Sequence, residues 1–113
     1  MGAKETPPTL AYSPVFTLYG HSRSISSLAF SPDGLLLASA SADKTAKIWS
    51  LRSGALIHTL KGHAGGISDV AWSPCSRYLV TASDDGVVAL WNATKVSVSL
   101  GKQSGKRVFR SMF

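Results

Sequence analysis

Residues 20–49 read GHSRSISSLAFSPDGLLLASASADKTAKIW, and residues 62–91 read GHAGGISDVAWSPCSRYLVTASDDGVVALW. The second stretch repeats the first after a shift of 42 residues, and no gap is needed to align them. Between residues 17–50 and 59–92, 14 of 34 positions are identical, and most of the others keep their chemical character. Self-similarity at a fixed period of this size is typical of repeat architectures. The chain therefore contains two copies of one structural unit.

Each unit alternates apolar and polar residues with a period of two, and turn residues interrupt it every 8 to 12 residues. In the turn Ser31-Pro32-Asp33-Gly34, proline fixes φ and glycine permits a positive φ. No stretch has a helical period, so the pattern predicts an all-β chain. The expected strands are Ile25–Phe30, Leu36–Ser41, Ala46–Leu51, Leu56–Lys61, Ile67–Ser73, Tyr78–Ser83, Val87–Trp91 and Val96–Leu100, with an extra strand, Val15–Tyr19, ahead of the first unit.

The length and composition suit one ordinary domain with a buried core. The chain has 113 residues, of which 44% are hydrophobic and 16% charged. Its longest apolar run, residues 35–38, is far too short to span a membrane. The single cysteine, Cys75, excludes an internal disulfide and a cysteine-rich zinc site. We therefore expect neither a metal nor a cofactor.

The positive charge is concentrated at one end of the chain. The net charge is +6, and residues 95–113 carry five basic side chains and no acidic one. A basic tail can contact nucleic-acid phosphates, but most such tails are simply solvated. Nucleic acid is therefore an unlikely partner, although a basic-tailed nucleic-acid binder remains an alternative. A salt-titrated DNA-binding assay distinguishes a solvated tail from a nucleic-acid-binding tail, because binding through phosphate contacts weakens steeply as the salt concentration rises.

A unit of about 40 residues with four short strands, Gly-His at its front and Trp at its end is the signature of a β-propeller blade. On residues 20–49 and 62–91 the sequence resembles the WD-repeat family, whose name-giving Trp-Asp stands here as Trp49-Ser50 and Trp91-Asn92. The resemblance implies two four-stranded blades over residues 15–94. A proline-containing arm, 1–14, precedes them, and the basic non-repeat tail, 95–113, follows. Because the repeat stops after two units, we expect a partial, open propeller.

His, Ser and Asp within one unit suggest a catalytic triad, but the same set recurs in both units. A catalytic site is needed once, whereas a blade-stabilising network is needed in every blade. In the WD-repeat family, such residues form a buried tetrad in which Asp orients His and a hydroxyl joins His to the indole N–H. The resemblance therefore implies structural residues and no enzyme. They are His21, Ser39 or Ser41, Asp43 and Trp49 in the first unit, and His63, Thr81 or Ser83, Asp85 and Trp91 in the second.

Residues 66–73, GISDVAWS, and 79–85, LVTASDD, narrow the resemblance. They are similar to the WD-repeat core subunits of SET/trithorax-type (COMPASS-like) complexes, which methylate lysine 4 of histone H3. In those subunits the central opening takes the histone H3 tail or an arginine-containing motif of the methyltransferase. The resemblance implies a histone-tail-reading assembly subunit in the nucleus. The positions that match peptide-contacting residues are Ser26, Ala42, Ser68, Asp69 and Asp84.

A second interpretation keeps the fold and changes the complex. A generic WD-repeat scaffold, in ubiquitin ligation or ribosome assembly and in the nucleus or the cytoplasm, would carry the same repeated tetrads. Rim residues such as Asp84 favour the methyltransferase-type interpretation, because rims diverge faster than tetrads. Both interpretations predict protein partners, and neither predicts a membrane.

Overall fold

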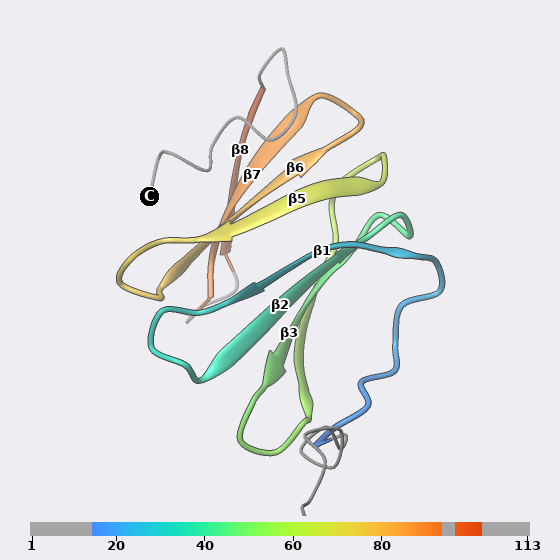
Figure 1. The fold of residues 1–113 in the computed structure, drawn as a ribbon. Coiled ribbons are helices and arrows are strands. Elements are labelled where there is room, and N and C mark those ends of the chain that lie inside the picture. Colours follow the sequence, from blue (N-terminus) through green and yellow to red (C-terminus); the bar gives the residue numbers. More distant parts are fainter. Residues whose placement is uncertain (1–14, 94–96, 103–113) are drawn as a thin grey trace, which may run out of the picture.

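The computed structural model describes residues 15–93 and 97–102, the latter through the backbone alone, and arranges them as two four-stranded antiparallel sheets (Figure 1). We call them blade 1 and blade 2. Blade 1 contains β1 (Ile25–Phe30), β2 (Leu36–Ser41), β3 (Ala46–Ser50) and β4 (Leu56–Leu60), and blade 2 contains β5 (Ile67–Trp72), β6 (Tyr78–Ser83), β7 (Val87–Asn92) and β8 (Ser97–Lys102). Each strand pairs with the next one in the chain. The prediction of two four-stranded, all-β blades is confirmed, and no helix long and apolar enough to cross a membrane occurs in the described residues.

The prediction of an extra strand at Val15–Tyr19 is wrong, because this segment has no strand conformation. Among the described strands, none pairs with it, and extended backbone without a partner leaves its N–H and C=O groups unsatisfied. Most of the segment is exposed, and Phe16 makes a side-chain contact. A Cβ added at Gly54, in the turn between β3 and β4, would lie only 2.6 Å from Cδ1 of Phe16, so the phenyl ring rests directly on that glycine.

The other strand boundaries shift by one or two residues at most. Strands β3, β4 and β5 end one residue earlier than the sequence pattern predicts, and β7 ends one residue later. Strand β8 begins at Ser97, inside the range predicted as a non-repeat tail, and it pairs with β7 from Val87 to Asn92. Residues 97–102 thus complete the sheet of blade 2. Residues 1–14 and 103–113 of the predicted arm and tail lie outside the described residues.

The core of the molecule lies between the two blades. Blade 1 contributes three alanines together with Ile48 and Leu60, and blade 2 contributes mostly bulky side chains from β5, β6 and β7. These buried residues form one cluster of Ala38, Ala40, Ala46, Ile48, Leu60, Ile67, Val70, Trp72, Leu79, Ala89 and Trp91. The contact runs along β5, which packs on both β1 and β2. Blade-on-blade packing therefore removes from water what a single sheet would leave exposed.

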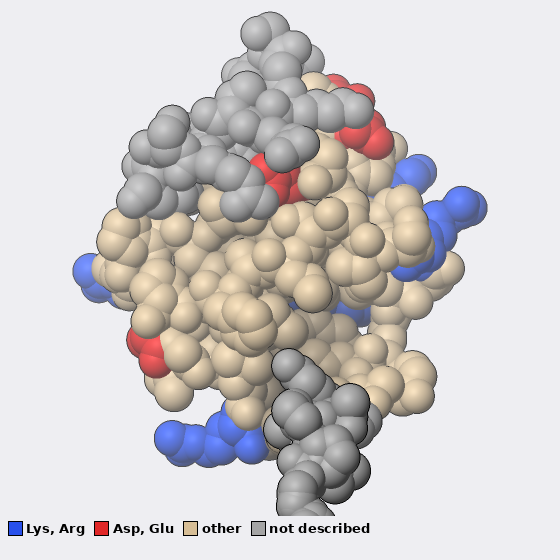
Figure 2. All heavy atoms as spheres, in the orientation of Figure 1, with Lys and Arg blue, Asp and Glu red and all other residues tan. Residues whose placement is uncertain are grey.

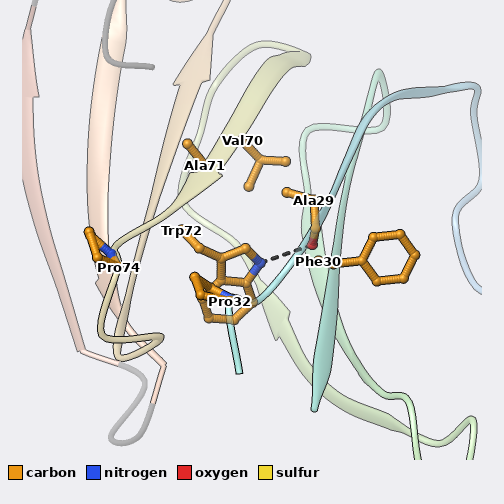
Figure 3. A pocket seen from close by; sticks show the side chains of 7 residues that line it. All are labelled: Ala29, Phe30, Pro32, Val70, Ala71, Trp72 and Pro74. Carbon is orange, nitrogen blue, oxygen red and sulfur yellow. Dashed lines mark hydrogen bonds between the residues drawn. The ribbon is translucent and has the colours of Figure 1, made fainter. Parts of the chain in front are cut away.

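Hydrogen bonds fix how β5 lies against β1. The indole Nε1 of Trp72 donates to the carbonyl oxygen of Ala29 at 2.9 Å, across a shallow pocket between the two strands (Figure 3). Near the turns that follow these strands, the amide of Asp33 donates to Oγ of Ser76 at 3.0 Å. Directional bonds of this kind select one packing angle, which apolar contact by itself does not.

Substituting Trp72→Phe tests this contact, because phenylalanine keeps an aromatic ring and removes the indole donor. We expect a loss of about 1–3 kcal/mol in the free energy of unfolding, since the Ala29 carbonyl loses its partner and part of the ring volume is lost. Urea denaturation measures the change. The control is Phe30→Leu at the equivalent, exposed position of blade 1, which should change stability by about 0.5 kcal/mol or less. Equal effects of both substitutions would contradict the assignment.

Candidate functional site

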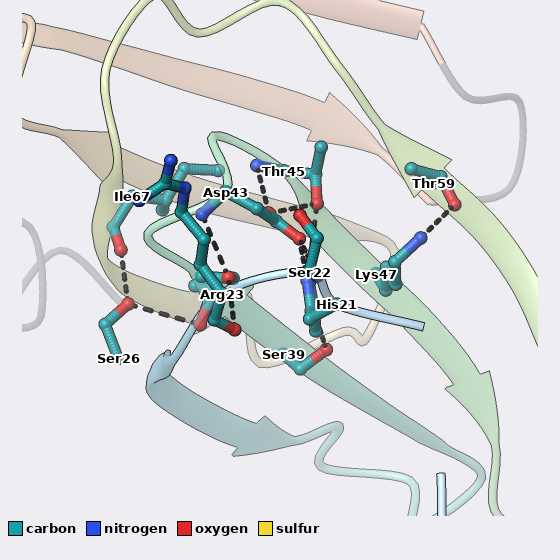
Figure 4. Close-up of polar contacts among 12 residues, drawn as sticks. His21, Ser22, Arg23, Ser26, Ser39, Asp43, Thr45, Lys47, Thr59 and Ile67 are labelled. Carbon is teal, nitrogen blue, oxygen red and sulfur yellow. Dashed lines mark hydrogen bonds and ion pairs between the residues drawn. The ribbon is translucent and has the colours of Figure 1, made fainter. Parts of the chain in front are cut away.

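In blade 1, four side chains meet in one hydrogen-bonded network, and Figure 4 shows three of them, His21, Ser39 and Asp43. His21 Nδ1 lies 2.9 Å from Oδ2 of Asp43, and His21 Nε2 lies 2.7 Å from Oγ of Ser39. The indole Nε1 of Trp49 donates to the same Oγ at 2.9 Å. The network therefore ties the Gly-His turn to β2, to β3 and to the turn between them.

Blade 2 repeats the network with a threonine. His63 Nε2 lies 2.7 Å from Oγ1 of Thr81, and Nε1 of Trp91 donates to that oxygen at 2.9 Å. The link to the carboxylate is looser, because His63 Nδ1 lies 3.5 Å from Oδ2 of Asp85. This buried nitrogen has no hydrogen-bond partner among the described residues. The second network is thus the weaker of the two.

The alternative hydroxyls have a different role. Ser41 Oγ donates to the carbonyl oxygen of Arg23 at 3.2 Å, and Ser83 Oγ donates to that of Gly65 at 3.0 Å. Each oxygen also accepts a bond from the amide two residues later, in the turn that follows β2 or β6. Ser39 and Thr81 therefore join the networks, while Ser41 and Ser83 close the turns beside them.

Hydrogen bonds keep the acid of the blade 1 network ionised. Burial acts to raise the pKa of Asp43, but bonds from the Thr45 hydroxyl, His21 and the Ser22 amide outweigh burial and lower the pKa below its ordinary value. An ionised Asp43 can accept from Nδ1–H of His21. The Ser39 oxygen accepts from the indole, which leaves its hydroxyl hydrogen available to donate to Nε2.

In blade 2, burial is the main influence on the histidine. It lowers the pKa of His63 below its ordinary value, although the nearby Asp85 carboxylate acts to raise it. Burial also acts to raise the pKa of Asp85, but donation from the amides of Ala64 and Val87 lowers it overall. The imidazole lies beside a carboxylate, and a buried hydroxyl shared between the ring and the indole ties three segments of the blade together. The arrangement is suited to stabilising a blade.

Two of the predicted peptide-contacting residues lie at β-bulges. The register of β1 with β2 shifts between Ile25 and Ser27, and that of β5 with β6 shifts between Ile67 and Asp69. The residue inside each bulge is the predicted serine, and a bulge turns a side chain away from the regular alternation. Ser26 Oγ and Ser68 Oγ each donate to a β2 or β6 carbonyl at 3.2 Å. Ser26 Oγ also donates across the blades to the carbonyl oxygen of Ile67.

The structure brings two more of these residues together around a glycine. A Cβ added at Gly66 would lie 3.2 Å from Cα of Ala42 and 3.6 Å from Oδ2 of Asp84. The amide of Asp84 donates to the carbonyl oxygen of Gly66 at 2.9 Å. Ala42 and Asp84 are both exposed, so this corner between the blades presents a carboxylate beside small residues.

Asp69 is placed differently from the other residues of this set. Only 1% of it is exposed, and Oδ1 accepts bonds from the Val70 amide at 2.9 Å and from Ser27 Oγ, in blade 1, at 3.2 Å. Its role as a peptide contact stays a prediction, and its observed contacts link the blades. Sequence reasoning missed Ser27. The available signal was that Ser27 and Asp69 occupy equivalent positions of the repeat with complementary hydrogen-bonding chemistry.

Among the described residues outside the networks, no group of three or more His, Cys, Asp or Glu side chains lies close enough to hold a metal ion. Cys75 is exposed, and a hydrogen bond with the Ser73 hydroxyl is the main cause that lowers the pKa of its thiol to about 7. Among the hydrogen bonds of the described residues, none joins the Cys75 thiol to a histidine that could act as a general base.

Comparison with known proteins agrees with this architecture. The family described as "WD domain, G-beta repeat" matches residues 12–50 and 54–92, which is more than half of the chain. Protein Mut11 of Chlamydomonas reinhardtii is 50% identical over 51 residues, and Ribosome assembly protein 4 of Chaetomium thermophilum is 41% identical over 51 residues. Each match covers 45% of this chain but only 14% and 10% of the respective relative.

Solved structures give the same result. The structure of U3-55K and the crystal structure of the RRP9 WD40 repeats both align with a TM-score of 0.71 and 27% sequence identity. Each covers 80% of this chain, which in turn covers 29% and 28% of those chains. The chain therefore spans a small part of the proteins it is similar to. The narrower resemblance to histone methyltransferase subunits stays a prediction.

Thr81→Val tests the network in blade 2, because valine has the same shape and lacks the hydroxyl. We expect a loss of about 2–4 kcal/mol in the free energy of unfolding, since the buried His63 and Trp91 nitrogens both lose a partner. The control is Thr17→Val, an exposed residue outside the strands, which should be nearly neutral. Chemical denaturation of both variants measures the difference. A neutral Thr81→Val would show that the network does not stabilise the blade.

Stability should fall as the pH is lowered. His63, Asp43 and Asp85 all have a lowered pKa in the folded chain, so the unfolded chain binds protons first as the pH falls. We expect the urea midpoint to decrease as the pH drops below about 6.5, where His63 is protonated in the unfolded chain. A second decrease should follow below about 4, where the unfolded aspartates are protonated. Urea midpoints measured from pH 7.5 to 3.5 test this, and a midpoint that rises on acidification would contradict it.

Proposed function

The chain belongs to the WD40 repeat family, and on that premise we propose that it is a non-catalytic scaffold that binds protein partners during the assembly of a larger complex. The repeated network is the observation that carries this proposal. The His, Asp, hydroxyl and indole groups that could serve catalysis are used in both blades to hold strands together. The surface outside these networks is therefore the part of the chain that we expect to bind partner proteins.

The composition of that surface suits protein binding. Figure 2 views the molecule from the side of β1 and β5, where uncharged side chains occupy the middle and Lys and Arg lie at the margins. Exposed apolar side chains on this part of the chain include Ile25, Leu28 and Phe30. An uncharged patch with a polar rim is typical of protein interfaces.

Ribosome assembly is the process that the names of the relatives support best. Besides the Chaetomium protein, Ribosome assembly protein 4 of Saccharomyces cerevisiae is 38% identical over 50 residues, and this match covers 10% of that protein. A nuclear location is part of the same proposal. Sucrose-gradient sedimentation of a tagged chain tests it, because an assembly scaffold should migrate with preribosomal particles. Migration only in the light fractions would contradict this role.

The second candidate is recognition of a basic peptide, such as the histone H3 tail, in a methyltransferase-type complex. The corner around Gly66 favours it, because the exposed Asp84 carboxylate lies beside the small residue Ala42, with Ser26 and Ser68 on the bulges of the adjacent strands. A carboxylate in this position can accept a charge-assisted hydrogen bond from a lysine or arginine side chain. Asp69 belongs to this set only through its resemblance.

Asp84→Asn tests the peptide site, since it removes the charge and keeps the shape. If the proposal holds, a basic H3-tail peptide should bind about 10-fold to 100-fold more weakly, as expected for a lost charge-assisted bond worth about 1.5–3 kcal/mol. Isothermal titration calorimetry measures the affinity, and circular dichroism checks the fold.

The matched control is Asp33→Asn. Asp33 lies in the turn between β1 and β2, whereas Asp84 lies in the turn between β6 and β7, at the other end of the strands. Asp33→Asn should leave the affinity unchanged, because Asp33 lies away from the corner around Gly66. It is a matched control because each of the two variants removes one negative charge. An equal loss of affinity in both variants would show that only the overall charge of the protein matters. An unchanged affinity in Asp84→Asn would exclude this site.

A further inference from the structure

The two blades carry opposite charge at the end of the strands where the corner around Gly66 lies. Three positions of the repeat at this end hold basic or small residues in blade 1, and an acid or glycine in blade 2. After the shift of 42 residues, the pairs are Arg23 and Gly65, Ala42 and Asp84, and Lys44 and Gly86. Arg23, Lys44 and Asp84 are all exposed. Figure 2 shows this contrast at its right side, where acidic side chains lie over the end of blade 2 and basic ones lie below them, over blade 1.

The histidine of blade 2 does not neutralise the negative charge at this end. The side chain of His63 is 1% exposed, and its Nδ1 lies 3.5 Å from Oδ2 of Asp85 without a hydrogen bond to any described residue. Burial lowers the pKa of this ring below its ordinary value, so the ring is neutral at pH 7. Asp84 and Asp85 therefore place two negative charges in one turn.

Strand β8 ends beside this turn. It runs antiparallel to β7, and its last residue, Lys102, pairs with Val87, the first residue of β7 (Figure 1). Val87 directly follows the turn that contains Asp84 and Asp85. The chain therefore leaves β8 at the same end of blade 2 at which the two carboxylates lie.

The residues that follow β8 have the complementary charge. Residues 103–113, which we call the basic segment, read QSGKRVFRSMF. They include Lys106, Arg107 and Arg110 and no acidic residue, so they carry three positive charges. The basic segment lies outside the described residues, and its sequence is that of a ligand for an acidic surface.

The chain is long enough for the basic segment to reach the carboxylates. An extended chain spans at most about 3.6 Å per residue, so Asp84 Cα lies within about 11 Å of Val87 Cα. Facing residues of antiparallel strands are about 5 Å apart, which places Lys102 Cα within roughly 16 Å of Asp84 Cα. The five residues from Lys102 to Arg107 span up to about 18 Å. Gly105 lies between them and permits the backbone to turn back over the end of the sheet.

We propose that the basic segment binds across the turn between β6 and β7, with Arg107 or Arg110 at the corner around Gly66, and competes there with the basic peptide of a partner. The inference rests on the peptide site proposed above. The positive charges of Arg23 and Lys44 hold the segment on the side of blade 2, because like charges repel.

Attachment to the same chain makes this competition effective. A short flexible connection gives the attached group an effective concentration of about a millimolar or more at its site. A peptide from a partner must displace the segment, so its apparent affinity falls by the fraction of chains in which the corner is open. The segment thus excludes weak basic ligands and admits those that bind the corner strongly.

The double variant Arg107→Gln/Arg110→Gln, made in the full 113-residue chain, tests this competition. The matched control is Arg52→Gln/Arg77→Gln, which removes the same two positive charges from exposed residues in turns at the opposite end of the strands. Isothermal titration calorimetry with the basic H3-tail peptide measures the affinity. We expect the segment variant to bind the peptide about 3-fold to 30-fold more tightly than the wild type, and the control to bind it as the wild type does.

The NMR signals of the Gly66 and Asp84 amides give a second measurement that needs no peptide. We expect both signals to shift in the segment variant relative to the wild type and to stay in place in the control. Raising the salt concentration from about 0.05 M to about 1 M should move the wild-type signals toward those of the segment variant, because salt screens the charges.

The two measurements separate this inference from the proposed peptide site. Equal peptide affinity in the wild type and the segment variant, with a loss in Asp84→Asn, would overturn the competition and leave the peptide site in place. If no variant binds the peptide but the amide signals shift as expected, the peptide function fails and the contact of the segment stands. Unchanged amide signals in the segment variant, or an equal gain of affinity in the control, would overturn the inference.

Discussion

One shared hydroxyl oxygen in each blade is the point on which the rest of the structure depends. In blade 1, Ser39 Oγ faces His21 and accepts from the Trp49 indole, and Thr81 Oγ1 does the same for His63 and Trp91. Three separate chain segments meet at that atom, and the residues that supply it, Ser39 and Thr81, are buried. An unsatisfied buried donor costs about 1–3 kcal/mol, so strand order and register are favoured only where all these bonds form together.

With each sheet fixed in this way, the period-two alternation of strands gives every blade two different faces. One face carries bulky side chains such as Val70 and Trp72, and the other carries alanines such as Ala38 and Ala40. The two fit each other because interiors pack at nearly crystalline density, which favours large groups against small ones. Bonds across the contact, from Ser27 to Asp69 and from Trp72 to Ala29, then set the angle between blades.

A fold of this kind separates stability from recognition. The side chains with catalytic chemistry are buried in networks that hold the strands, while bulges and turns carry exposed groups such as Ser26, Ala42 and Asp84. Rim residues such as Ala42 and Asp84 stand next to the network residues Asp43 and Asp85 in the same turns, but the bonds of the networks run through Asp43 and Asp85. This separation explains why a repeat family can be recognised on its tetrads while its partners are set by the rim, and why the proposals above concern surfaces.

The sequence by itself determined the repeat, the all-β class and, to within one or two residues, the strands of both blades, because these follow from local patterns of period two and from turn residues. It placed the network residues but could not choose between Ser39 and Ser41, or between Thr81 and Ser83. Residues two apart share one face of a strand, and only the pairing of β2 with β3 decides which hydroxyl the Trp49 indole reaches. Val15–Tyr19 has a strand-like sequence, yet a strand needs a neighbour to satisfy its backbone, and the described fold gives it none. The burial of Asp69 against Ser27 was likewise decided by tertiary structure, because it depends on where the second blade packs on the first. Local sequence patterns do not determine how two separate sheets pack on each other.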